Sequence, residues 1–243
     1  MLIIKAQDYN DMSRKAARFI AAQVQLKPNS VLGLATGSTP LGTYRELIRF
    51  HRQEELSFCD VRTVNLDEYY GLPSTHPQSY CHYMQEHLFN HIDITPGNTH
   101  IPDGLADDPN AYGREYDDLI VCMGGIDVQL LGIGSKGHIA FNEPSQVFST
   151  QTRLVDLNET TIEDNARFFE SEEEVPRQAI SMGMKSIMAA KRILILASGN
   201  GKAEAVKAMV EGPVDPMVPA SILQLHPDVI LIADATALSL LAQ

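Results

Sequence analysis

The segment 132–143 contains the residue types best suited to proton transfer. An apolar run at 128–131 ends in its glycine-rich turn, and His138 and Glu143 follow within a few residues. A histidine gains and loses a proton near neutral pH, and a carboxylate beside it can fix its tautomer. Glycines that end a predicted strand and lead at once to an acid–base pair therefore indicate an active site rather than a core segment.

The turn 36–40, Thr-Gly-Ser-Thr-Pro, has the composition of a phosphate-binding turn between a strand and a helix. Gly37 lets the backbone approach a ligand, and Thr36, Ser38 and Thr39 add hydroxyls to the first N–H groups of the helix. The Gly-Lys-Ser/Thr ending of a P-loop is missing. Taken alone, the turn fits a phosphate site and a simple helix cap equally well.

Two more predicted strands end in charged residues. Asp67 and Glu68 form an adjacent carboxylate pair, in which a neighbouring charge and partial burial can raise one pKa toward neutrality. The turn 198–202 brings Lys202 to the start of a helix, where a bound anion would offset its conflict with the helix dipole. An exposed acidic turn and a solvated lysine are the alternative interpretations.

His82, His87 and His91 raise the question of a metal site. His87 and His91 are four residues apart, but Leu88 stands where the zinc signature H-E-x-x-H requires glutamate. We therefore interpret the three as surface or packing histidines and predict no metal site.

Helix and strand patterns alternate along the chain and must position these residues. Strands are expected at 1–5, 31–35, 61–66, 126–133, 193–197 and 229–233, and helices after the cap Asp8 to about 26, from Pro40, at 80–89 and at 202–211. This alternation predicts an α/β fold over 1–243, one domain with an open, mainly parallel sheet and helices on both faces, a Rossmann-like three-layer sandwich. Ligands of such sheets bind beyond the carboxyl ends of the strands.

Composition excludes several classes of partner. The chain has 243 residues, is 44% apolar and carries a formal charge of −12, so it repels nucleic acid and anionic membranes. No apolar run is long enough to span a membrane, and the first residues lack the pattern of a signal peptide. The scattered cysteines, Cys59, Cys81 and Cys122, predict a reduced, cytoplasmic protein.

Five segments together resemble the glucosamine-6-phosphate deaminase family, also called glucosamine/galactosamine-6-phosphate isomerases. They occur in the family's order and spacing over nearly the whole chain, at 32–40, 65–72, 132–144, 165–169 and 223–227. The resemblance implies that D-glucosamine 6-phosphate and water become D-fructose 6-phosphate and ammonia without a cofactor. The sugar phosphate is the expected partner, and family members are monomers or homo-oligomers.

The resemblance also assigns roles to individual residues. His138, oriented by Glu143, would open the sugar ring, and Asp67 would then remove the proton at C2. The phosphate would lie in the turn 36–39, while Lys202 and Arg167 match the family's phosphate cations. The last of these belongs to a stretch, about 157–177, that resembles the family's mobile lid.

Two departures from the family pattern carry expectations of their own. Lys136 stands where many members have an acid or amide that helps to orient the histidine, so its place among the catalytic residues is in question. Arg153 matches a cation that binds an N-acetylglucosamine 6-phosphate effector, but Val155 replaces a matching lysine. We therefore predict weak or absent activation by that effector.

Two other functions compete with this interpretation. A 6-phosphogluconolactonase-like hydrolase would share the phosphate turn and the Gly-His segment, although the motif at 65–69 argues against it. A non-catalytic domain that senses sugar phosphates would have no need of Asp67, His138 and Glu143.

Overall fold

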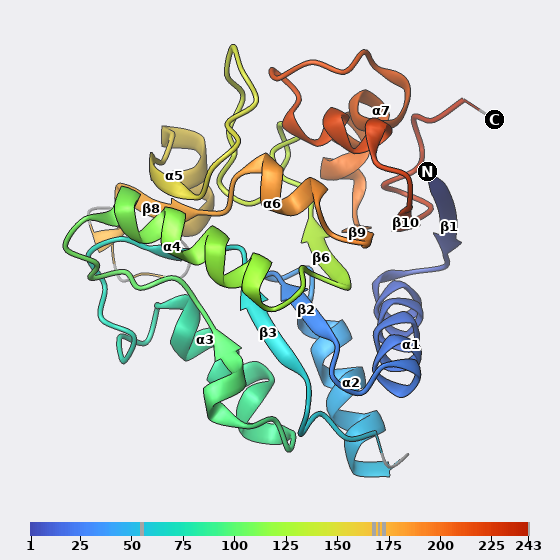
Figure 1. Cartoon of the computed structure of the whole chain (residues 1–243). Helices are drawn as coiled ribbons and strands as arrows, with labels where there is room; N and C mark the ends of the chain where they lie inside the picture. The colour runs from blue at the N-terminus through green and yellow to red at the C-terminus, as the bar shows by residue number, and fades with distance from the viewer. Residues whose placement is uncertain (54–55, 167–168, 170, 172–173, 243) are drawn as a thin grey trace.

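The computed structural model describes residues 1–53, 56–166, 169, 171 and 174–242. Within them, seven parallel strands form a central sheet in the order β1-β10-β9-β6-β2-β3-β5 (Figure 1). Their bounds are Leu2–Ala6, Val229–Asp234, Arg192–Ala197, Val128–Gly132, Val31–Leu34, Arg62–Asn65 and Thr99–His100 in that order. The predicted parallel α/β sheet is confirmed.

Alternate strand residues face two separate layers of helices. On β9, Ile193 and Ile195 pack in one hydrophobic cluster, whereas Leu194 and Leu196 pack in the other. The cluster with Leu194 receives α1, α2 and α3, which are Tyr9–Leu26, Leu41–Gln53 and Tyr80–His87. The opposite cluster receives α4, α6 and α7, which are Pro109–Cys122, Met184–Met188 and Ala203–Glu211 (Figure 1). Burial on both faces explains why the central strands are almost wholly apolar.

A second, antiparallel sheet was not predicted. It consists of β4, β8 and β7 in that order, with bounds Asp67–Tyr69, Gln178–Ser181 and Arg153–Asp156. The strand expected at 61–66 ends at Asn65, because the chain then leaves the central sheet and pairs with β8. Helix α5, Glu159–Ala166, contributes Ile162 to the small apolar cluster that also holds Tyr69.

The helix ends agree with the sequence patterns to within a few residues. Asp8 caps α1 by accepting a hydrogen bond from the Asp11 N–H at 2.7 Å. Helix α2 begins at Leu41 rather than at Pro40. A 3-10 turn, Asn200–Lys202, precedes α7, so the helix expected at 202–211 starts at Ala203.

The strand order changes direction between β2 and β6. From β2 the chain moves to β3 and β5 on one side, whereas β6, β9 and β10 follow on the other. The loops after β2 and β6 therefore run to opposite sides and leave a crevice between them at the carboxyl ends of the strands. Both loops carry candidate site residues.

Candidate active site

One pocket at this crevice brings together side chains that lie far apart in the sequence. It is lined by residues 36–39 after β2, by Asp67 after β3, by His138 after β6 and by Lys202 after β9. Tyr80, Phe141, Thr161 and Asn165 complete much of its wall. The pocket therefore combines hydroxyls, a cation, a histidine and a buried carboxylate.

The turn 36–39 is held in place by tyrosine hydroxyls. Gly37 has φ +89°, which favours glycine, and its carbonyl accepts from the Tyr83 hydroxyl at 2.6 Å. The Ser38 carbonyl accepts from the Tyr9 hydroxyl at 2.9 Å. Within the described residues, no backbone carbonyl accepts from the N–H groups of Gly37, Ser38 or Thr39. Such N–H groups ahead of a helix are suited to bind an anion.

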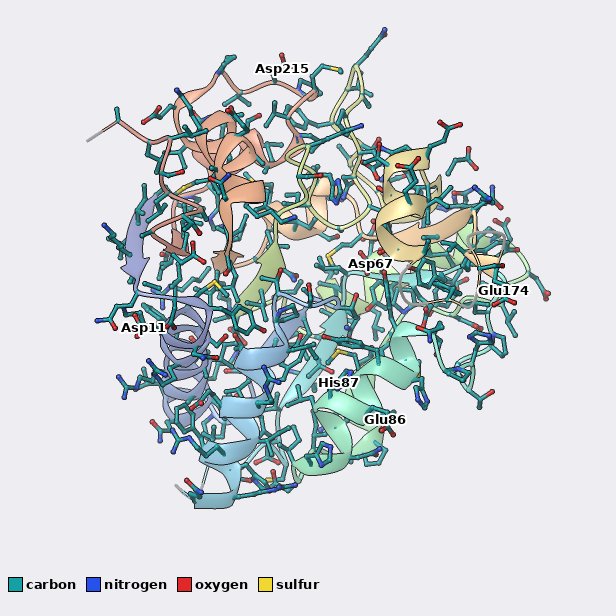
Figure 2. All side chains as sticks on the ribbon, turned by 180° about the vertical axis from the view of Figure 1, so that it is seen from behind. Asp11, Asp67, Glu86, His87, Glu174 and Asp215 are labelled. Carbon is teal, nitrogen blue, oxygen red and sulfur yellow. The ribbon has the colours of Figure 1, made fainter. Side chains whose placement is uncertain are left out.

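Asp67 lies where the chain passes from the central sheet to the second sheet. The Leu66 carbonyl accepts from the Met182 N–H at 2.7 Å, and Asp67 pairs with Ser181 on β8. The residue is only 6% exposed, and Figure 2 shows it inside the outline of the molecule. Burial, and secondly the neighbouring Glu68, raise the pKa of Asp67 to about 8.

Glu68 is buried and stabilises the backbone beside the pocket. Its carboxylate accepts from the N–H groups of Tyr69 and Tyr80, both at 2.8 Å, and of Cys81 at 2.9 Å. Burial raises the pKa of Glu68 to about 7, although these three hydrogen bonds act in the opposite direction. The carboxylate thus ties the first turn of α3 to β4 and carries Tyr80 to the pocket wall.

The loop after β6 places His138 against Glu143. The His138 Nδ1 lies 3.2 Å from Glu143 Oε2, and Glu143 Oε1 accepts from the Thr161 hydroxyl. Burial by itself would raise the pKa of Glu143, but the nearby His138 ring and the hydrogen bond from Thr161 outweigh it and lower the pKa. A Cβ on Gly134 would lie 2.2 Å from His138 Nε2, so only glycine leaves room for the imidazole.

The backbone beyond His138 is held in an uncommon conformation. Ala140 has φ +51°, which is rare for a residue with a side chain. Asn142 stabilises this turn, since its Nδ2 donates to the carbonyls of Ile139 at 3.2 Å and Met182 at 2.8 Å. Its Oδ1 accepts from Arg153 Nη1 at 3.1 Å. Strained backbone that its surroundings hold in place is common at functional sites.

The remaining predicted residues differ in where they lie. Lys202 lines the pocket, whereas Lys136 is exposed, does not line it and donates from Nζ to the Thr160 hydroxyl at 2.8 Å. Arg167 lies outside the described residues. The stretch expected to form a lid, about 157–177, contributes Thr161 and Asn165 to the wall, but its movement stays a prediction.

Sequence patterns gave no signal for several residues of the wall. The Tyr80 and Phe141 rings stack with centroids 6.2 Å apart, and the Tyr69 ring lies 4.8 Å from Tyr80. Tyr80 was expected only as the start of a helix, and Asn165 only as part of a family motif. Their positions depend on contacts between distant segments, which no local spacing reveals.

The three histidines around α3 do not converge. The ring of His87 packs on Tyr83 at 4.5 Å, while His91 Nε2 lies 2.9 Å from the Glu86 carbonyl. Figure 2 shows Glu86 and His87 on α3, away from Asp67. In the part of the chain that the structure describes, no group of three His, Cys, Asp or Glu residues is arranged to hold a metal ion.

Comparison of the sequence with known proteins gives close and nearly full-length relatives. The glucosamine-6-phosphate deaminase of Halothermothrix orenii is 54% identical over 241 residues, which are 99% of this chain and 100% of that protein. The glucosamine-6-phosphate deaminase of Lachnoclostridium phytofermentans is 56% identical over 232 residues, 96% of this chain and 98% of that protein. Among the described residues, none of the helices is long and apolar enough to cross a membrane.

Comparison of the structure agrees with these relatives. A solved structure of a monomeric glucosamine-6-phosphate deaminase matches with a TM-score of 0.97 and 50% identity, covering 99% of this chain and all of that one. The 6-phosphogluconolactonase of Leishmania guyanensis, 22% identical with a TM-score of 0.77 over 99% of each chain, shares the fold. A family model described as glucosamine-6-phosphate isomerases/6-phosphogluconolactonase matches residues 6–231. The chain therefore belongs to the glucosamine-6-phosphate isomerase/6-phosphogluconolactonase family.

Proposed function

We propose that this chain converts D-glucosamine 6-phosphate and water into D-fructose 6-phosphate and ammonia. The observation that carries the proposal is the single pocket in which a buried Asp67, the His138–Glu143 pair and an anion-binding turn meet. The relatives that are 54–56% identical over nearly their whole length and are named for this activity support it. The 6-phosphogluconolactonases are far more distant in sequence.

The two ends of the pocket divide the work between binding and proton transfer. The phosphate binds at the turn 36–39 and to Lys202, where N–H groups and a cation both favour negative charge. His138 exchanges a proton with the ring oxygen and thereby opens the sugar to its aldehyde form. Glu143 holds Nδ1 of this histidine, which leaves Nε2 for the substrate.

Asp67 acts on the open sugar. Its carboxylate removes the proton at C2, next to the C1 carbonyl, and the electron pair shifts to give an enol that still bears the amine. Return of a proton to C1 moves the double bond to C2 as an imine, to which water adds before ammonia leaves. Burial helps, because a carboxylate with a raised pKa is a stronger base.

The proposed setting is the cytoplasm. Cys59, Cys81 and Cys122 are all free thiols, and such cysteines are typical of reducing compartments. We also keep the stretch 157–177 as a lid, supported by the side chains of Thr161 and Asn165 in the wall of the pocket. A lid there would exclude water from the open-chain sugar.

Steady-state ammonia release tests the proposal directly. Wild type should release ammonia from glucosamine 6-phosphate and should not hydrolyse 6-phosphogluconolactone at a comparable rate. Asp67→Asn should lose about 10²–10⁴-fold in kcat while still binding the sugar phosphate, since a positioned base contributes that much.

Asp60→Asn is the matched control for this variant. Asp60 is exposed and precedes β3, at the opposite end of the strand that Asp67 follows, so its loss should leave turnover unchanged. Near-normal turnover by Asp67→Asn would remove Asp67 from its role. Binding of the sugar phosphate without release of ammonia by wild type would favour the sensor instead.

A further inference from the structure

Asp234 lies at the end of β10 and is the centre of a dense set of hydrogen bonds outside the catalytic residues. The residue is only 6% exposed. Burial by itself would raise the pKa of Asp234, but its hydrogen bonds, first that from Ser198, outweigh burial and lower the pKa to about 2. The carboxylate is therefore a fixed negative charge at neutral pH.

The two oxygens of this carboxylate hold different segments. Oδ1 accepts from the Thr236 N–H at 3.0 Å, the Thr236 hydroxyl at 2.6 Å and the Ala237 N–H at 2.9 Å, all within its own turn. Oδ2 accepts from the Ser198 hydroxyl at 2.6 Å and the Gly199 N–H at 3.0 Å, which belong to the loop after β9. One carboxylate thus joins the ends of two neighbouring strands.

The loop held by Oδ2 is the one that carries Lys202 into the pocket. Gly199 has φ +90°, and its carbonyl accepts from the Lys202 N–H at 3.1 Å, which closes the 3-10 turn Asn200–Lys202. The N–H and the carbonyl of Gly199 therefore connect Asp234 with the backbone of Lys202. A shift of this loop would move the lysine relative to the turn 36–39.

We propose that Asp234 is a positioning residue for phosphate recognition, because its Oδ2 anchors the loop that presents Lys202 to the anion. This inference rests on the proposed function only in taking the phosphate end of the pocket to be the end formed by Ser38 and Lys202. Asp234 itself contacts neither substrate nor reacting atoms.

Asp234→Asn tests the anchor selectively. The amide oxygen should turn toward the three donors on the Oδ1 side, which turns the amide NH₂ toward Ser198 and Gly199. The Ser198 hydroxyl can accept from this NH₂, but the Gly199 N–H loses its acceptor. We expect KM for glucosamine 6-phosphate to rise about tenfold with kcat within about twofold, the pattern of lost uniform binding. Calorimetry with inorganic phosphate should show a matching loss of affinity.

Two further variants separate positioning from general stability. Thr236→Val removes a hydrogen bond to Oδ1 of the same carboxylate, so it should lower Tm and leave KM and phosphate affinity unchanged. Ser198→Ala removes a hydrogen bond to Oδ2 and should weaken phosphate binding in the same direction as Asp234→Asn. It also keeps the test open if Asp234→Asn does not fold.

The outcomes distinguish failure of the inference from failure of the proposed function. Unchanged phosphate affinity in both Asp234→Asn and Ser198→Ala, with a lowered Tm, would overturn the positioning role. Phosphate calorimetry requires no turnover, so it tests the anchor even if wild type releases no ammonia. In a Lys202→Met background, Asp234→Asn should weaken phosphate binding no further, since both changes remove the same contact.

Discussion

At the scale of single residues, the carboxylates of the site differ in pKa because their neighbours differ. Asp67 has burial and a like charge beside it, so its pKa is raised to about 8. Glu143 is also largely buried, but the nearby His138 ring and a hydrogen bond from Thr161 lower its pKa. At neutral pH Asp67 therefore keeps its proton, whereas Glu143 is charged. This difference is what an acid–base pathway through one pocket requires.

The raised pKa of Asp67 makes a prediction for the pH dependence of catalysis. A base must be ionised, so kcat/KM should rise with pH and level off above about pH 8. Glu68→Gln removes the neighbouring charge that helps to raise this pKa, so the rising limb should move to lower pH. Ammonia release measured across the pH range checks both curves. An unmoved limb in Glu68→Gln would show that the Glu68 charge does not act on the base.

The space beside Gly134 makes a second prediction at this scale. In Gly134→Ala the new Cβ would lie 2.2 Å from two ring atoms of His138, so the imidazole must move from its present position. Because even a small displacement of a reacting group slows the reaction strongly, kcat/KM should fall by about 10²-fold. Gly97→Ala is the control, since a Cβ there meets no atom within 4 Å. Equal activity in both variants would contradict the fit described for His138.

At the scale of elements, long apolar runs were predictable and short, half-buried strands were not. The strands β9 and β10 are apolar except for one charged residue each, Arg192 at the start of β9 and Asp234 at the end of β10, because both faces are covered. The strands β7 and β8 have no such signature; β7 is half-buried or exposed along its whole length. The strands β4 and β8 are mostly buried but only three and four residues long, so no apolar run or alternation marked the second sheet in the sequence.

The same distinction applies to the candidate site. Gly37, Asp67 and His138 stood out as short motifs of adjacent residues, but the motifs of Gly37 and Asp67 also fitted simple turns. The resemblance to a family was needed to assign all three to one site, and the structure places them in one pocket. Asp234 and Tyr80 did not stand out, because their importance comes from hydrogen bonds and ring contacts across about 36 and 61 residues of chain. Local spacing carries no information about such partners. Sequence patterns therefore do not predict those parts of the site that depend on the packing of distant elements.

An element-scale prediction concerns the link between α1 and the turn 36–39. The Tyr9 hydroxyl donates to the Ser38 carbonyl at 2.9 Å and accepts from the Gly42 N–H at 2.8 Å. Tyr9→Phe removes both hydrogen bonds and should loosen the turn, raising KM about fivefold with little change in kcat. Tyr112→Phe, which removes a hydroxyl from α4 in the opposite helix layer, should leave KM unchanged. Steady-state kinetics on both variants makes the comparison.

At the scale of the whole molecule, two buried acids at opposite ends of the sheet, Asp127 and Asp67, differ in their partners. At the amino ends of the strands, the Asp127 carboxylate accepts from Lys27 Nζ at 2.6 Å, Lys191 Nζ at 2.7 Å and the Val31 N–H at 2.8 Å. These partners outweigh burial and lower the pKa of Asp127. At the carboxyl ends of the strands, no hydrogen bond or ion pair to a cation is seen for Asp67 within the described residues. An ionised Asp67 therefore lowers the stability of the fold, whereas an ionised Asp127 raises it.

This difference predicts that Asp67→Asn stabilises the protein, increasingly so at higher pH. The Asp67 pKa is about 8 in the folded chain, against a usual value of 3.8, so between these pH values the folded state binds more protons than the unfolded state. Wild-type stability therefore falls as pH rises through this window, whereas the asparagine variant does not share the fall. Urea unfolding at pH 5 and pH 8 measures the difference.

Asp127→Asn should change the free energy of unfolding in the opposite direction in the same experiment. The pKa of Asp127 is lowered in the folded state, so its stabilising contribution is present above the usual aspartate range and is lost only as pH falls. The Asp127 variant should therefore be less stable than wild type at both pH 5 and pH 8. If the stability gained by Asp67→Asn were the same at the two pH values, Asp67 would not titrate between them. Ionisation of Asp67 would then not lower the stability of the folded protein.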